Sequence, residues 1–184
     1  MIVVPTWDLF ITLFFIVCMG YGVILQREKI LATLISTYIA LAVASVWGDK
    51  VFEFFNGNSI LFNQFWIRSN MSEFSIKALL FGLLIVLLTL KGDFSVSIGK
   101  AEGMISTVFV FIYSFLNTGL IVVSVINFLP QTAKMTILSQ SNIASLVMNY
   151  DVAWVVVPAL LMVVGGFLTA RAGGGGGGGA PPAA

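Results

Sequence analysis

Long uncharged intervals separate the charged side chains of this sequence, and they constrain the fold more than any other feature. Four intervals between consecutive charges hold 18, 19, 31 and 19 residues; they are bounded by Asp8 and Arg27, Lys29 and Asp49, Glu102 and Lys134, and Asp151 and Arg171. An α-helix needs about 20 predominantly apolar residues to cross the hydrocarbon core of a bilayer. The pattern therefore predicts an all-α fold, a polytopic bundle of transmembrane helices.

A fifth interval, from Lys77 to Lys91, holds only 13 uncharged residues, a length more typical of buried or re-entrant segments. It can still cross the membrane if the two lysine stems extend along the helix and place their ammonium groups at opposite interfaces. We therefore expect about five spans, or four if this short segment does not cross. The expected spans are residues 7–26, 30–48, 76–91, 104–129 and 152–170.

The composition excludes several classes of protein. Only 9% of the residues are charged and 59% are hydrophobic, whereas a soluble domain carries about 25% charged residues. The lipid bilayer is thus the first expected partner. A net charge of +1 gives no field that attracts nucleic acid. With no histidine, one cysteine and no nucleophile or phosphate-loop motif, we expect no enzyme, no bound metal and no cofactor.

Local chemistry marks the ends of the segments. Asp8 and Asp151 each stand where a helix begins, and a carboxylate is favoured at that positive end of the helix dipole. The short charged stretch 27–29 predicts a turn between the first two spans, which would form an antiparallel helical hairpin. Pro130 ends the fourth span, because proline cannot continue a helix.

Two connections are unlike ordinary loops. Residues 50–75 are dense in aromatic side chains, which favour the headgroup layer, so we expect one or two short interfacial helices broken at Asn56 and Gly57. Residues 131–150 are less aromatic. There Ser141 is expected to cap a short helix that carries three apolar side chains on one side: Ile143, Leu146 and Val147.

The distribution of basic residues predicts the orientation. Five of them, in connections close to the span ends, fall on one side with the C-terminus, and four fall on the other side. The first set is Arg27, Lys29, Lys91, Lys100 and Arg171; the second is Lys50, Arg68, Lys77 and Lys134. Short basic connections favour the cytoplasm, so we expect the N-terminus outside and the C-terminus in the cytoplasm.

The fourth span carries most of the candidate functional residues. Its hydroxyl and amide side chains recur at helical spacing and therefore share one broad face: Thr107, Tyr113, Ser114, Asn117, Thr118 and Ser124. This face is interpreted in two ways. It either lines a path for water or a polar substrate, or its groups bond to neighbouring helices and to their own backbone.

Small residues mark candidate positions of close helix packing. They are Cys18 and Gly22 in the first span, Gly99 and Gly103 before the fourth, and Gly165 and Gly166 in the fifth. Small side chains let helix backbones approach closely. The stretch from Pro158 to Gly166 is either a passive kink or a hinge that opens a gate.

Several of these features, spread over residues 7–150, together resemble the colicin V production (CvpA-like) membrane proteins of bacteria. The residues that carry the resemblance are Asp8, the pair Gly20-Tyr21, the turn Arg27-Glu28, and Gly99 with Gly103. Ile24 stands where that family usually has a second glycine, and the fifth span lies outside the pattern. The resemblance implies an inner-membrane protein associated with toxin export, envelope homeostasis or solute movement.

Two functional hypotheses follow. In the first, the chain oligomerises, or joins a membrane-protein partner, and provides or supports a transport path along the fourth span. In the second, it is a non-conducting scaffold that holds partner proteins at the membrane. Residues 172–184, which contain seven consecutive glycines, are expected to be a disordered tail, or a linker if the natural chain continues.

Overall fold

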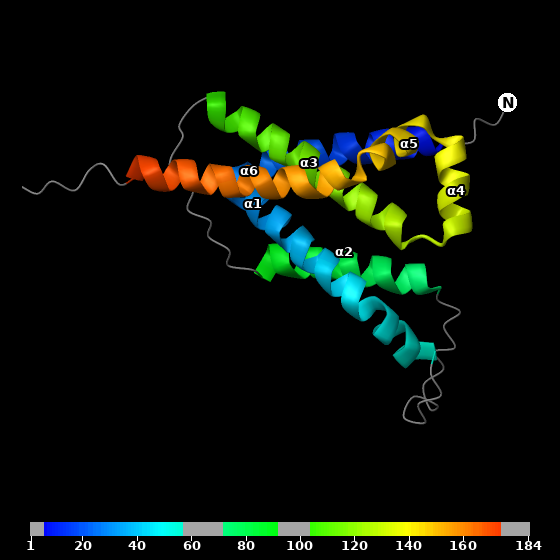
Figure 1. Ribbon diagram of the computed structural model, residues 1–184. Helices are drawn as coiled ribbons and strands as arrows, with labels where there is room; N and C mark the ends of the chain where they lie inside the picture. Colours follow the sequence, from blue (N-terminus) through cyan, green and yellow to red (C-terminus); the bar gives the residue numbers. More distant parts are fainter. Residues whose placement is uncertain (1–5, 57–71, 92–103, 174–184) are drawn as a thin grey trace, which may run out of the picture.

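The computed structural model describes residues 6–56, 72–91 and 104–173, and nearly all of them are helical. The helices are α1 (Trp7–Asn56), α2 (Glu73–Lys91), α3 (Met104–Phe128), α4 (Gln131–Gln140), α5 (Asn142–Asn149) and α6 (Asp151–Gly173). No strand occurs within these ranges. The predicted all-α bundle is confirmed (Figure 1).

Helix α1 folds back on itself, so that it supplies two spans. Its N-terminal arm is Trp7–Ile24 and its C-terminal arm is Lys29–Phe55. Ile11 in the first arm clusters with Val123 and Ile126 of α3. A cluster that includes Ala44 of the second arm packs against Phe128, in the same half of α3. In Figure 1 the N-terminal arm (blue) runs away from the end of the bundle at which the chain begins, and the C-terminal arm (light blue) returns toward that end.

The expected turn at residues 27–29 is wrong, because the backbone there remains helical. No glycine or proline occurs from residue 23 to residue 47. A helical backbone satisfies its own hydrogen bonds, which an irregular turn near the bilayer does not. The chain therefore reverses within a stretch that stays helical and not at a turn.

Helix α2 packs antiparallel to the C-terminal arm. Phe81, only 1% exposed, clusters with Ala40 and Ala44, whose side chains are fully buried. The helix is 19 residues long, which gives about 28 Å at 1.5 Å per residue. It begins at Glu73, earlier than expected, and the Ser72 hydroxyl accepts a hydrogen bond from the backbone N–H of Ser75 at this end (3.3 Å).

The interfacial helices expected over residues 50–75 are wrong where the structure describes that stretch. Residues 50–56 continue α1, and residues 73–75 belong to α2. The apolar helices thus continue beyond the charged residues at which the expected spans ended. Residues 57–71, which hold the remainder of that expectation, lie outside the described residues.

Helices α4 and α5 follow α3 after Pro130. The expected cap of α5 is confirmed, since the Ser141 hydroxyl accepts a hydrogen bond from the Ala144 N–H (2.9 Å). The expected apolar side is only partly right: Val147 is buried, but Leu146 is 59% exposed. The buried side of this short helix instead centres on Ala144 and Val147.

The structure gives four candidate spans, or five if the bent pair of α5 and α6 is one span, where about five were expected. Four stretches are long and apolar enough to cross a membrane: Trp7–Ile24, Lys29–Phe55, Glu73–Lys91 and Thr107–Phe128. Helices α5 and α6 meet at an angle of 57° and together would form a fifth. The start of α1 lies beside α5, and α6 ends at the opposite end of the bundle (Figure 1).

Candidate functional site: the buried polar face of α3

Helix α3 lies at the centre of the bundle. It contacts α1, α2, α5 and α6. Five of the six candidate path residues are buried within these contacts, whereas Thr107 is exposed. The structure therefore buries the expected polar face inside the protein, except for Thr107, the first residue of that face.

Two hydroxyl groups on this face, those of Thr118 and Ser124, bond to their own helix. Thr118 donates to the Ser114 carbonyl (2.8 Å), and Ser124 donates to the Leu120 carbonyl (2.7 Å). The facing arm of α1 repeats the pattern at three buried residues: Thr33, Ser36 and Thr37. Such bonds to the carbonyl one turn earlier satisfy a hydroxyl without a neighbouring helix. This matches the packing interpretation of the polar face.

Two atoms on the same face have no hydrogen-bond partner. The Ser114 hydroxyl oxygen and the Asn117 amide oxygen are both buried and unpartnered, in side chains that are 1% and 5% exposed. A buried polar group without a partner costs about 1–3 kcal/mol. The two residues stand three apart on α3 and therefore lie on neighbouring parts of one helix face.

Gly22 is the point at which the N-terminal arm of α1 meets this face. A Cβ atom built on Gly22 would lie 1.8 Å from the Ser114 hydroxyl oxygen, so only glycine fits there. Cys18, one turn earlier, lies near Thr118. The structure thus brings Cys18 and Gly22 to a close helix contact, as small residues at this spacing indicate.

The structure does not test close helix packing at the other four glycines expected to allow it. Gly99 and Gly103 lie outside the described residues. Gly165 and Gly166 are helical within α6, and their surroundings lie outside the described residues. A glycine that the sequence reasoning missed, Gly119 of α3, does make a close contact: a Cβ atom built there would lie 2.0 Å from the Trp154 ring.

Two tyrosines attach α6 to the bundle, and one of them, Tyr38, was missed. The Tyr38 hydroxyl donates to the Val155 carbonyl (2.5 Å), and the Tyr113 hydroxyl donates to the Leu161 carbonyl (3.1 Å). These carbonyls flank Pro158, which lacks an N–H and weakens the helix's own hydrogen bonding. The sequence does contain a signal for Tyr38, because a tyrosine stands inside an apolar span there. A buried tyrosine hydroxyl usually has a hydrogen-bond partner.

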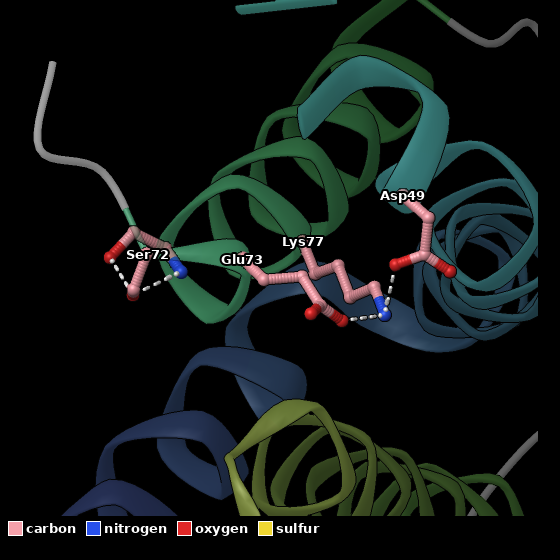
Figure 2. A network of polar contacts seen from close by, with 5 residues as sticks. Asp49, Ser72, Glu73 and Lys77 are labelled. Carbon is pink, nitrogen blue, oxygen red and sulfur yellow. Dashed lines mark hydrogen bonds and ion pairs between the residues drawn. The ribbon is translucent and has the colours of Figure 1, made fainter. Parts of the chain in front are cut away.

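A second polar cluster joins α1 to α2 at the end of the bundle. The Lys77 ammonium pairs with Asp49 (2.7 Å) and Glu73 (2.5 Å). Figure 2 shows the ammonium between the two carboxylates. The Lys77 stem crosses Gly48, where an added Cβ would lie 2.5 Å from the lysine Cγ. Lys77, expected to place its ammonium group at an interface, pairs with carboxylates of two helices.

Within the described ranges, no group of three or more histidine, cysteine, aspartate or glutamate side chains is placed to hold a metal ion. No protein-family model, curated protein or solved structure matches this chain. The resemblance to the CvpA-like proteins therefore stays a prediction. The identification that the fold itself carries is coarser: this chain is an all-helical protein whose long apolar helices are those of a multi-pass membrane protein.

Proposed function

We propose that the chain is a CvpA-like bacterial inner-membrane protein that supports transport or export, as one subunit of an oligomer or with a membrane-protein partner. The observation that carries the proposal is the pair of buried, unpartnered atoms on α3, the Ser114 hydroxyl oxygen and the Asn117 amide oxygen. Buried polar groups without partners are uncommon and call for a specific explanation. A polar substrate that passes α3 would supply the missing hydrogen bonds.

The lining chemistry selects the kind of substrate. Hydroxyl and amide groups donate and accept hydrogen bonds but carry no charge. The ion pairs of the described residues lie instead at one end of the bundle, around Lys77. A path of this kind suits a small uncharged polar solute, for which hydrogen-bond groups along the path replace water.

The proposed orientation places the N-terminus outside and the C-terminus in the cytoplasm. It rests on the basic residues of the short connections, since such residues favour the cytoplasmic side. An odd number of spans agrees with it, because α1 begins and α6 ends at opposite ends of the bundle (Figure 1).

The test measures solute flux in proteoliposomes. Ser114, Asn117 and Thr118 are replaced together by alanine, and swelling in urea and in glycerol is followed by stopped-flow light scattering. We expect the swelling rate to fall to that of protein-free vesicles. A matched variant, with alanine at the exposed hydroxyl residues Thr132, Thr136 and Ser139 of α4, should keep the wild-type rate. Equal rates for wild type, both variants and empty vesicles would contradict transport of these solutes.

The alternative function is a non-conducting scaffold that anchors partner proteins. One observation favours it: the hydroxyls of Thr118, Ser124 and the facing α1 arm already bond to their own helices, as in a closed packed interior. Exposed aromatic residues at the end of α1, Phe54 and Phe55, would then contact partners. Replacing both with serine should release co-purifying membrane proteins while α1 stays inserted; unchanged co-purification would remove the support for a scaffold.

A further inference from the structure

A cavity of about 370 Å³ lies at the end of the bundle where α1 begins. Its wall is built by four helices, α1, α2, α3 and α4, and every lining side chain is aliphatic or aromatic. Its lining includes Trp7, Val125, Ile126, Leu129 and Ile137. A cavity with no polar partner for water stays dry or takes up hydrocarbon.

The position of the cavity in the membrane follows from α4. This helix lies across the direction of the long helices at the end of the bundle (Figure 1), and most of its residues are polar. A mostly polar helix at the end of long apolar spans lies outside the hydrocarbon core, at the level of the headgroups. Trp7, which also lines the cavity and is 41% exposed, is a residue type enriched at that level. The cavity therefore lies just beneath the headgroup layer.

A basic side chain stands beside the cavity. The Lys134 ammonium donates to the Asn127 amide oxygen (2.7 Å). Lys134 precedes the cavity residue Ile137 by three positions on α4, which places both on one side of that helix. In the sequence, Asn127 lies between two cavity residues, Ile126 of α3 and Leu129, which directly follows that helix. The ion pairs of the described residues involve Lys77, so no described carboxylate neutralises Lys134.

We propose that this end of the protein binds an anionic phospholipid of the surrounding bilayer, with one acyl chain in the cavity and the phosphate on Lys134. The wholly apolar wall matches a hydrocarbon chain. The ammonium, which has a neutral amide as its described partner, matches a phosphate, to which lysine binds as a point charge. The inference does not depend on transport, because neither Ser114 nor Asn117 lines the cavity.

Native mass spectrometry of the full chain tests the headgroup contact. The protein in detergent is titrated with phosphatidylglycerol and, separately, with phosphatidylcholine, which carries no net charge. We expect phosphatidylglycerol to bind more tightly, and Lys134→Gln to weaken it about tenfold, as expected for the loss of a charged hydrogen bond. Lys50→Gln removes a lysine that instead lies over the Trp47 ring, and it should leave both affinities unchanged.

Filling the cavity tests the acyl-chain contact. Val125→Phe and, as a second variant, Leu129→Phe place an aromatic ring in the cavity. Each should weaken the binding of both phosphatidylglycerol and phosphatidylcholine. Val163→Phe changes a side chain of α6 that is 55% exposed, and it should leave the affinity for both lipids unchanged. The proposal is overturned if Lys134→Gln binds phosphatidylglycerol as wild type does. It is equally overturned if either cavity variant that elutes as folded protein retains wild-type lipid affinity.

Discussion

Asp8, in the first turn of α1, accepts a hydrogen bond from the Ser141 hydroxyl, 133 positions later in the chain (2.6 Å). The same carboxylate oxygen accepts from the backbone N–H of Ile143 (3.0 Å). Asp8 was expected to serve the dipole of its own helix. It also caps α5, where the exposed N–H groups of a helix start favour a negative charge. The contact joins the first helix to the segment that leads into the last span.

Removing this contact should loosen α5. Ser141→Ala deletes an N-cap whose side chain is buried, and it should lower the free energy of unfolding by about 1–2 kcal/mol. Asp8→Ala should also lower the melting temperature in detergent. Asp151→Ala is the control, since the Asp151 carboxylate accepts from Val152 in its own helix. A melting temperature that falls as far for Asp151→Ala as for Asp8→Ala would argue against a special role of Asp8.

Gly22 and Gly20 give a matched pair of substitutions on one arm of α1. Gly22→Ala should destabilise the protein by about 1–3 kcal/mol, because the new methyl group overlaps the Ser114 hydroxyl. Nothing lies within 4 Å of a Cβ at Gly20, so Gly20→Ala should stabilise the helix by about 0.5–1 kcal/mol. Thermal unfolding in detergent measures both. Adding Ser114→Gly to Gly22→Ala should recover much of the loss, and a lack of recovery would place the clash elsewhere.

Tyr38 should hold α6 through one hydrogen bond. Tyr38→Phe removes the bond to the Val155 carbonyl and keeps the ring, so a loss of about 1 kcal/mol is expected. Tyr21→Phe is the control, because the Tyr21 side chain is 54% exposed. If Tyr38→Phe and Tyr21→Phe both unfold at the wild-type temperature, the tyrosine bond contributes nothing to the position of α6.

The cluster around Lys77 should hold α2 against α1. Lys77→Met keeps the stem over Gly48 but leaves the Asp49 and Glu73 carboxylates without their cation, so the melting temperature should fall. Lys91→Met makes the same change at an exposed residue at the other end of α2 and should have little effect. Because the Asp49 and Glu73 side chains are 59% and 53% exposed, added salt should screen these ion pairs and reduce the difference between the two variants. Equal melting temperatures for the two variants at low salt would contradict a role of the cluster in holding α2.

The fold followed from the sequence where one physical requirement dominates. The need to cross a bilayer without charges fixed the spans, and Ser141 was identified as a cap from its residue type. The reversal of α1 was expected as a turn, because a charged triplet resembles a loop. The exposed position of Leu146 depends on which side of α5 meets the bundle, and the local pattern does not contain that information.

The candidate site was predicted less completely. Five of six polar residues of α3 are buried as one band, yet helical spacing alone does not reveal whether a hydroxyl bonds to its own backbone or to nothing. Thr118 and Ser114 share the face and differ in this respect. Tyr38, Gly119 and the Asp8 contact depend on residues distant in sequence, so they required the three-dimensional arrangement.

A bundle of five spans places its two ends on opposite sides of the membrane, and the accessibility of single cysteines tests this arrangement. In a Cys18→Ser background, Thr6→Cys, Glu53→Cys and Ser139→Cys report one end, whereas Lys91→Cys and Ala172→Cys report the other. Intact cells and inverted vesicles are labelled with a membrane-impermeant maleimide. We predict that the first three label from outside and the last two from the cytoplasm. Labelling of Glu53→Cys and Lys91→Cys from the same side would show that α2 does not cross, and labelling of Ser139→Cys and Ala172→Cys from the same side would contradict the fifth span.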